Sequence, residues 1–182
     1  KHSLILDKKF FLWLLKNGKQ IINSENIQAL KYAIIQSCKI KSKVVSADEK
    51  EKDLRTILNF GHTFAHGFEG AKNFSKALNH GEAVLLGIIM ASEFSYERKI
   101  LPKKDLILIK KHFNSLSLTL NIKKIFKKVE VNKIVYFAKK DKKNVSNKIN
   151  LILIKKIGKI LSPSGFNITT NEFKKFLLSR WK

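Results

Sequence analysis

Residues 82–96 constrain the fold most strongly, because the segment EAVLLGIIMASEFSY is apolar on nearly every side. It shows neither the two-residue alternation of a half-buried strand nor the single apolar stripe of a surface helix. A helix of this composition is stable only where other elements surround it. The sequence therefore predicts a mainly α-helical domain with a central buried helix over residues 82–96.

The remainder of the chain carries further helical patterns and several helix boundary signals. The helices expected from them cover residues 7–16, 24–38, 54–68, 102–114 and 131–140. Gly18 is expected to end the first of these helices, and Ser24 is expected to cap the second. Thr169 and Glu172 form a capping-box pattern, which predicts a final helix after them.

Two segments near the end of the sequence favour strands instead. Residues 149–154 and 157–161 are rich in β-branched side chains and are separated by Lys155 and Lys156, which predicts a small β-hairpin. No repeat and no linker rich in Gly, Ser or Pro interrupts the chain. We therefore expect residues 1–182 to form a single helical domain.

The chain has a net charge of +23, which is compatible with binding of nucleic acid or of anionic metabolites. The alternative is compositional drift, since lysine, isoleucine, asparagine and phenylalanine are all abundant, as an AT-rich genome would produce. Only Arg55, Arg98 and Arg180 are arginines, whereas specific readers of nucleic acid favour arginine for bidentate contacts. This shortage favours drift, and nucleic acid is not the expected partner.

The sequence also bears on where the protein works. No stretch of about 20 uncharged apolar residues is present, so no membrane span is expected. Asp7, Lys8 and Lys9 interrupt the apolar opening, which therefore does not fit a signal peptide. Cys38 is the single cysteine and cannot form an internal disulfide, which favours a reducing, cytoplasmic location.

Three of the five histidines, His62, His66 and His80, fall in one short stretch. His62 and His66 are four residues apart, which places both rings on one face of a helix. Imidazole is a common metal ligand and carries protons near neutral pH. Thr63 stands where a zinc-protease motif has its glutamate, which argues against peptide hydrolysis by that route. A hydrogen bond to a nearby carbonyl could explain one histidine alone, but three together favour a metal or acid–base site.

Polar residues that suit an anionic substrate precede these histidines. Arg55 lies seven residues and Asn59 three residues before His62, on the same face of the predicted helix, where Arg55 could grip a carboxylate or phosphate. A surface ion pair between Arg55 and Glu51 is the alternative. Glu82 either serves the site or only caps its helix.

Three blocks of the sequence resemble the 3-dehydroquinate synthase family. Residues 41–70, KSKVVSADEKEKDLRTILNFGHTFAHGFEG, resemble its K-x-x-V-V-x-x-D-E…L-R-x-x-L-N-x-G-H-T-x-x-H segment. Residues 78–95, LNHGEAVLLGIIMASEFS, resemble its L-x-H-G-E-A-V-x-x-G segment. The segment AKKDKKN, followed by INLILIKKIGK, resembles its D-K-K turn and the strand pair after it. The resemblance extends from the first residue to nearly the last.

The resemblance implies the multi-helical C-terminal domain of the dehydroquinate synthase-like fold, with a small β-hairpin. It implies a carbon–oxygen lyase of the shikimate pathway, which converts the seven-carbon sugar acid phosphate DAHP into 3-dehydroquinate and phosphate. The family uses bound NAD and a divalent metal, zinc or cobalt, and the metal polarises the hydroxyl that is oxidised. The implied partners are the substrate, the N-terminal NAD-binding half of the same enzyme and a second copy in a homodimer.

The family motifs also imply roles for single residues. His62 and His80 resemble two of the three metal ligands, whereas His66 resembles a catalytic histidine that contacts the substrate. The residues that resemble substrate-binding positions are Lys41, Arg55, Asn59 and Lys142, with Lys143 as an ambiguous neighbour of the last. Arg55 and Asn59 are also expected to act in catalysis.

The first residues resemble the end of a further family motif, A-E-V-I-K-H-G-x-I. Lys1 therefore resembles its catalytic-site lysine, and the glutamate that serves as the third metal ligand would lie upstream, outside the chain. No Gly-rich phosphate loop is present, so no residue is assigned to NAD. We expect a single metal- and substrate-binding domain, truncated at its N-terminus and inactive alone.

Two alternatives stay open. One is another sugar-phosphate cyclase, or a metal-dependent polyol dehydrogenase, with the same two-domain plan. The other belongs to a different class and is a basic helical protein that binds nucleic acid.

Overall fold

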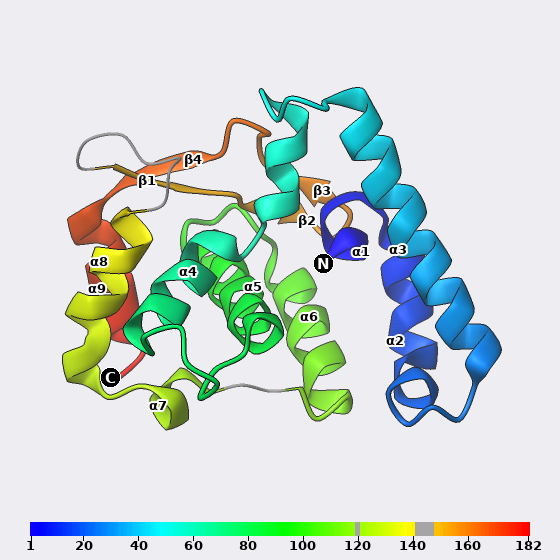
Figure 1. Ribbon diagram of the computed structural model, residues 1–182, viewed down its shortest axis with the longest axis horizontal. Coiled ribbons are helices and arrows are strands. Elements are labelled where there is room, and N and C mark those ends of the chain that lie inside the picture. Colours follow the sequence, from blue (N-terminus) through cyan, green and yellow to red (C-terminus); the bar gives the residue numbers. More distant parts are fainter. Residues whose placement is uncertain (119–120, 141–147) are drawn as a thin grey trace.

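The computed structural model describes residues 1–118, 121–140 and 148–182 (Figure 1). The α-helices are α1 (His2–Leu6), α2 (Lys8–Ile22), α3 (Ile27–Ala47), α4 (His62–Ala71), α5 (His80–Glu97), α6 (Lys103–Ser115), α7 (Ile122–Ile125), α8 (Val131–Lys139) and α9 (Thr170–Ser179). The remaining elements are the 3-10 helices η1 (Leu54–Asn59) and η2 (Lys128–Glu130) and the strands β1 (Lys148–Leu151), β2 (Ile154–Lys156), β3 (Lys159–Ile160) and β4 (Phe166–Thr169). The mainly helical class is confirmed. No helix within these ranges is long and apolar enough to cross a membrane.

The predicted central helix is confirmed as α5. It contacts α4 and α6, which lie on either side of it in Figure 1. Every residue from 86 to 92 is buried, so this part of α5 has no solvent-facing side. The α2–α3 pair covers one end of the molecule and the α8–α9 pair the other (Figure 1). The apolar character of the segment thus follows from the helices packed around it.

α4 and α5 approach each other at two glycines. A β-carbon at Gly87 would lie 2.1 Å from the carbonyl oxygen of Gly61, and one at Gly61 would lie 2.7 Å from the backbone nitrogen of Ile88. Gly61 also has a left-handed φ of 84°, which glycine adopts without strain. Because the opposing atoms belong to the backbone, neither position has room for a side chain. This contact fixes the start of α4 against the middle of α5.

The helix predicted over residues 54–68 is wrong in its middle. η1 ends at Asn59, Phe60 leaves the helical conformation with a ψ of 119°, and α4 begins only after Gly61. The Phe60 side chain is fully buried, so the break itself is anchored in the core. The apolar pattern continues through this point, since it records burial and not the path of the backbone.

Two other helix boundaries differ from the prediction. α2 continues through Gly18, where a β-carbon would lie 2.9 Å from Leu116 Cδ2, so this glycine allows close packing and does not end the helix. α3 begins after Asn26, whose side chain accepts the Ala29 N–H at 2.9 Å. Ser24 instead lies in the preceding turn with a φ of 59°. α3 also extends well beyond Cys38, to Ala47.

The predicted hairpin is present, although its turn lies later than expected. β2 pairs antiparallel with β3 around Gly158, which has a φ of 81°, and Lys155 and Lys156 belong to β2. β1 pairs antiparallel with the distant β4, and no local pattern indicated this pairing. The Thr63 hydroxyl of α4 donates to the Asn150 carbonyl of β1 at 2.9 Å. The β1–β4 sheet therefore borders α4 near its histidines.

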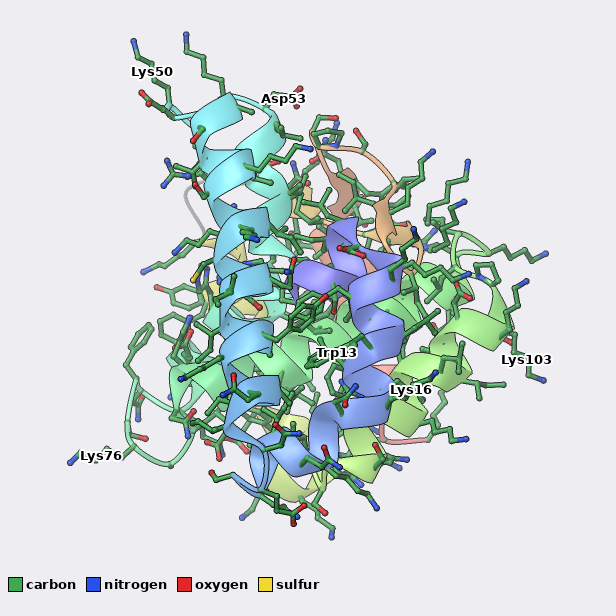
Figure 2. The ribbon with its side chains drawn as sticks, turned by 90° about the vertical axis from the view of Figure 1, so that its right-hand side faces the viewer. Trp13, Lys16, Lys50, Asp53, Lys76 and Lys103 are labelled. Carbon is green, nitrogen blue, oxygen red and sulfur yellow. The ribbon has the colours of Figure 1, made fainter. Side chains whose placement is uncertain are left out.

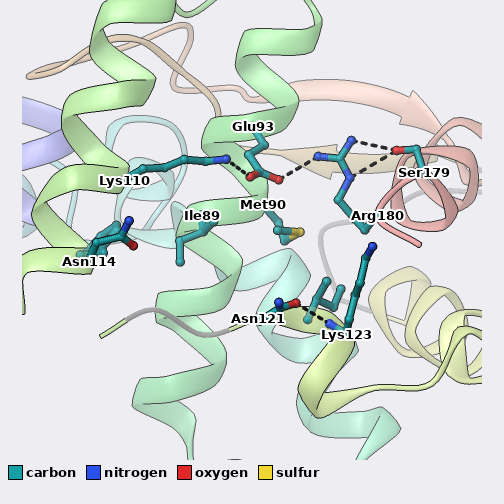
Figure 3. Close-up of a pocket in the computed structure, with 11 residues that line it drawn as sticks. Ile89, Met90, Glu93, Lys110, Asn114, Asn121, Lys123, Ser179 and Arg180 are labelled. Carbon is teal, nitrogen blue, oxygen red and sulfur yellow. Dashed lines mark hydrogen bonds and ion pairs between the residues drawn. The ribbon is translucent and has the colours of Figure 1, made fainter. Parts of the chain in front are cut away.

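One carboxylate joins three helices at the far side of α5. Glu93 of α5 pairs with Lys110 of α6 at 2.5 Å and with Arg180, directly after α9, at 2.8 Å (Figure 3). Arg180 also pairs with Glu97. These contacts border a cavity of about 500 Å³ between α5, α6, α7 and the end of α9. Since Glu93 and Glu97 together balance the charges of Lys110 and Arg180, we assign the ion pairs to holding the last helix in place.

Lysine side chains project from separated parts of the surface. Lys50, Lys76 and Lys103 point into solvent from three different regions of the molecule (Figure 2). These three do not form the single stripe that a nucleic-acid backbone would follow.

The glycine contact leads to a stability prediction. We expect Gly87→Ala to lower the free energy of unfolding by at least about 3 kcal/mol, because the added carbon meets backbone that cannot yield. Gly81→Ala, in the first turn of the same helix, is the matched control, since its β-carbon meets only Asn79 Oδ1 at 3.4 Å. Urea denaturation followed by circular dichroism measures both, and equal effects of the two substitutions would contradict the assigned contact.

Candidate metal and substrate site

α4 presents His62, His66 and Glu69 along one side, because these residues follow one another at intervals of four and three. His80, the first residue of α5, lies against this row. The ring centroids of His62 and His80 are 5.7 Å apart, and those of His62 and His66 are 5.9 Å apart. The structure therefore brings the three histidines together, with His62 in the middle.

The His62 ring is held in its neutral form. Burial, with smaller contributions from the charge of Lys1 and from the other two histidines, lowers the pKa of His62 to about 4. Its Nδ1 lies 3.4 Å from the Phe60 carbonyl oxygen, which can only accept a hydrogen bond. A neutral ring that donates from Nδ1 leaves Nε2 with a lone pair, which is the form that binds a metal.

His80 has a comparable arrangement. Its Nδ1 lies 3.0 Å from the Glu69 carboxylate, which is also an acceptor when ionised. The His80 side chain is 63% exposed, whereas that of Glu69 is only 16% exposed. Metal-binding histidines usually donate the second ring N–H to a carboxylate or a backbone carbonyl. The Nδ1 atom of His62 faces a backbone carbonyl, and that of His80 faces a carboxylate.

The spacing of these two rings fits a shared ion. When each Nε2 lies about 2 Å from one ion, the centroids of the two rings lie about 5–6 Å apart, and the observed separation is 5.7 Å. Within residues 1–118, 121–140 and 148–182, no three His, Cys, Asp or Glu side chains could hold a metal by themselves. Catalytic zinc normally has three protein ligands, so the described residues do not complete such a site by themselves.

Lys1 lies near His62, and Lys41 lies near Lys1. Burial, and to a smaller extent the charge of Lys41, lowers the pKa of Lys1. The charge of Lys1 in turn lowers the pKa of His62. Because such effects weaken rapidly with distance, the two lysines lie close to each other and Lys1 lies close to His62.

Arg55 and Asn59 do not occupy the helical face predicted for them, because the chain breaks at Gly61. Asn59 nevertheless lines a cavity of about 70 Å³ together with His66, so the structure brings these two predicted residues together by another route. The guanidinium of Arg55 donates to the carbonyl oxygen of Glu49 at 2.7 Å. The Asn59 side chain therefore lies at the edge of the histidine cluster, whereas that of Arg55 contacts the connection from α3 to η1.

Several residues of this region were not singled out from the sequence. Glu51, weighed only as a partner for Arg55, accepts a hydrogen bond from Asn59 at 3.0 Å. Asn150 and Ser164 line the small cavity beside His66, and they come from the part of the chain that the β1–β4 pairing brings to α4. Glu69 could have been found, since it lies two helical turns after His62. Asn150 and Ser164 offered no such signal.

Two other predicted residues do not enter the described site. Glu82 forms a capping box with Asn79, accepting its N–H at 3.0 Å while the Asn79 side chain accepts that of Glu82, so the capping alternative accounts for it. Lys142 and its neighbour Lys143 fall within residues 141–147, outside the described residues.

Asp48 organises the segment that carries Arg55. Its carboxylate accepts three backbone N–H groups at 2.9–3.0 Å, those of Lys52, Asp53 and Arg55. These hydrogen bonds, the one from Arg55 foremost, lower the pKa of the Asp48 carboxyl below its ordinary value of 3.8. One side chain thus shapes the connection from α3 to η1.

The chain is similar to known proteins over most of its length. The family model described as 3-dehydroquinate synthase C-terminal matches residues 1–144. The chain is 52% identical to the 3-dehydroquinate synthase of Pelagibacter ubique over 170 residues, which cover 93% of this chain and 46% of that protein. It is 35% identical to the 3-dehydroquinate synthase of Rhodopseudomonas palustris, and the match covers 87% of this chain and 42% of that protein. The chain thus spans about half the length of the curated relatives it matches.

Solved structures show the same fold at low identity. One is ValA, a 2-epi-5-epi-valiolone synthase from Streptomyces hygroscopicus with NAD+ and Zn2+ bound, at a TM-score of 0.74 and 18% identity over 99% of this chain and 48% of that chain. Another is 2-deoxy-scyllo-inosose synthase with carbaglucose-6-phosphate, NAD+ and Co2+. Its TM-score is 0.72 and its identity 20%, over 98% of this chain and 48% of that chain.

The Asp48 contacts predict local order that depends on pH. We expect Asp48→Ala to increase amide hydrogen exchange in residues 49–56 while the rest of the chain stays protected, because three N–H groups lose their acceptor. Folding lowers the pKa of the Asp48 carboxyl. The stabilisation from its three hydrogen bonds is therefore complete above the ordinary pKa of 3.8 and is lost as the pH falls through the lowered pKa.

The matched control for this experiment is Glu49→Ala, which keeps the carbonyl that Arg55 contacts. Mass-spectrometric exchange compares the two variants. Similar exchange in both would show that Asp48 does not order this segment.

Proposed function

Because the chain belongs to the 3-dehydroquinate synthase family through its C-terminal domain, we propose that it supplies the metal- and substrate-binding half of that enzyme. The complete enzyme converts DAHP into 3-dehydroquinate and phosphate. The observation that carries this proposal is the pair of His62 and His80, whose rings are 5.7 Å apart and whose Nδ1 atoms face a carbonyl and a carboxylate. Histidines that bind a metal usually have such a partner at the second ring nitrogen.

His62 and His80 would hold Zn2+ or Co2+ through their Nε2 atoms, and a third donor would come from the N-terminal half. When bound, the metal supplies Lewis-acid polarisation of a substrate hydroxyl, and NAD supplies hydride transfer. NAD+ with Zn2+ or Co2+ in the two solved cyclases supports this choice of cofactors. We assign NAD to the N-terminal half and to no described residue here.

Basic side chains would bind the anionic substrate. Lys41 and Arg55, together with Lys142, would neutralise its carboxylate and phosphate, and Lys1 would contact the reacting part beside His62. Arg55 uses one guanidinium nitrogen on the Glu49 carbonyl, which leaves further N–H groups for an anion. Asn59 would orient a hydroxyl group.

His66 would move a proton during elimination of phosphate. It lies next to His62 and lines the same small cavity as Asn59, so it is near both the metal ligands and a substrate-orienting amide. Imidazole can accept and return a proton near neutral pH. We propose that His66 acts on the substrate and does not bind the metal.

A related sugar-phosphate cyclase is the second candidate. The two solved neighbours are both cyclases of this fold, and their low identity to the chain supports the fold alone. Substrate preference separates the two candidates. The comparison is between DAHP and glucose 6-phosphate, because the carbocyclic analogue of glucose 6-phosphate is bound in one of the two solved cyclases. The homodimer and the cytoplasmic location expected from the sequence are retained as part of this proposal.

The two-ligand site predicts weak metal binding by the 182-residue chain. We expect a Kd for Zn2+ above about 1 µM, because catalytic sites normally have three protein ligands. His62→Ala or His80→Ala should abolish this binding, whereas His66→Ala should change it by less than about threefold. Calorimetric titration measures these values. Sub-micromolar binding that is lost in His62→Ala would contradict the two-ligand site.

Activity is expected only when the missing half is supplied. The chain alone should release no phosphate from DAHP with NAD and Zn2+. Phosphate release should appear on addition of the N-terminal half of the Pelagibacter ubique relative, and His66→Ala should then lower kcat by about 10²–10⁴. The control is Lys103→Ala, which changes an exposed lysine on α6. Turnover by the chain alone would refute the proposed division of the site.

A further inference from the structure

Glu69 occupies a distinctive place beside the histidine cluster. It lies on α4 two helical turns after His62, and its carboxylate contacts His80 Nδ1 at 3.0 Å. Its side chain is only 16% exposed, which is low for a carboxylate on a protein surface. The nearby cation of α4, Lys72, pairs with Glu130 of η2 at 3.0 Å. The position of Glu69 is therefore defined by its contact with His80.

This contact restricts the chemistry of the His80 ring. A neutral imidazole carries its proton on one of two nitrogens, and an ionised carboxylate can only accept. Glu69 therefore favours the tautomer with the proton on Nδ1, which leaves the lone pair on Nε2. His80 is 63% exposed and has few contacts to fix its ring, so the hydrogen bond also limits ring rotation.

Glu69 also supplies negative charge where cations predominate. Lys1 lies near His62 and would repel a divalent cation, and Lys41 adds positive charge near Lys1. A carboxylate beside His80 offsets this repulsion without occupying a ligand position.

We propose that Glu69 is a positioning residue, which holds the tautomer and orientation of His80 for metal binding through Nε2. This inference rests on the proposed metal site of His62 and His80. It assigns Glu69 no contact with the metal, because the carboxylate oxygen faces Nδ1 of the ring.

The first test is nitrogen NMR of the His80 ring in the metal-free 182-residue chain. We expect the Nδ1–H tautomer to dominate in the unaltered protein and to give way to a mixture in Glu69→Ala. Glu69→Gln should restore most of the Nδ1–H tautomer, since its amide oxygen can still accept the hydrogen bond. Glu130→Ala is the matched control, because it removes an ion pair at the end of α4 without touching His80.

The second test is a Zn2+ titration of the same proteins, in which the His80 ring signals report binding. We expect the Kd for Zn2+ to rise about 10–100-fold in Glu69→Ala, less in Glu69→Gln and not in Glu130→Ala. An unchanged tautomer and an unchanged Kd in Glu69→Ala would overturn the inference. Complete loss of binding in both Glu69 variants, as in His80→Ala, would make Glu69 a ligand and would also overturn it.

These outcomes separate the inference from the proposed function. If the unaltered chain binds no Zn2+ through His62 and His80, the proposed metal site fails, whatever the tautomer of His80. If Zn2+ binds through both histidines but the Glu69 variants match the unaltered chain, the metal site stands and the positioning role is overturned.

Discussion

The close approach of α4 and α5 is the contact on which the histidine cluster depends. Gly61 and Gly87 bring the two backbones together at a point where neither can carry a side chain. The same contact turns the chain sharply before His62 and holds α4 against a helix that is buried on all sides. Since α5 begins with His80, the proximity of the His62 and His80 rings follows from this backbone geometry.

The sequence predicted the helical class and the central helix because both depend on composition and local pattern. It also predicted the capping box of Thr169 and Glu172, which involves neighbouring residues only. It missed the break at Gly61, the role of Gly18 and the pairing of β1 with β4. These three depend on residues distant in the chain: Ile88, Leu116 and residues 166–169. An apolar periodicity carries no information about such contacts.

The site was predicted unevenly for a similar reason. The three histidines were found by spacing, and the structure brings them together. Arg55 and Asn59 were identified by a helical face that does not exist, yet Asn59 lines a cavity with His66. Asn150 and Ser164 come from a distant segment and carry no local signature, so the structure alone revealed them.

His62 and His80 are each the first residue of a helix, preceded by Gly61 and Asn79. Their ring positions are therefore set by where two helices start. If the register of α5 shifted by one residue, His80 would turn by about 100° around the helix axis and would leave His62. The hydrogen bond between the Asn79 side chain and the Glu82 N–H, at 3.0 Å, fixes where α5 begins. Under the proposed metal site, helix capping thus becomes part of coordination chemistry, because the Asn79 side chain determines where the His80 ring lies.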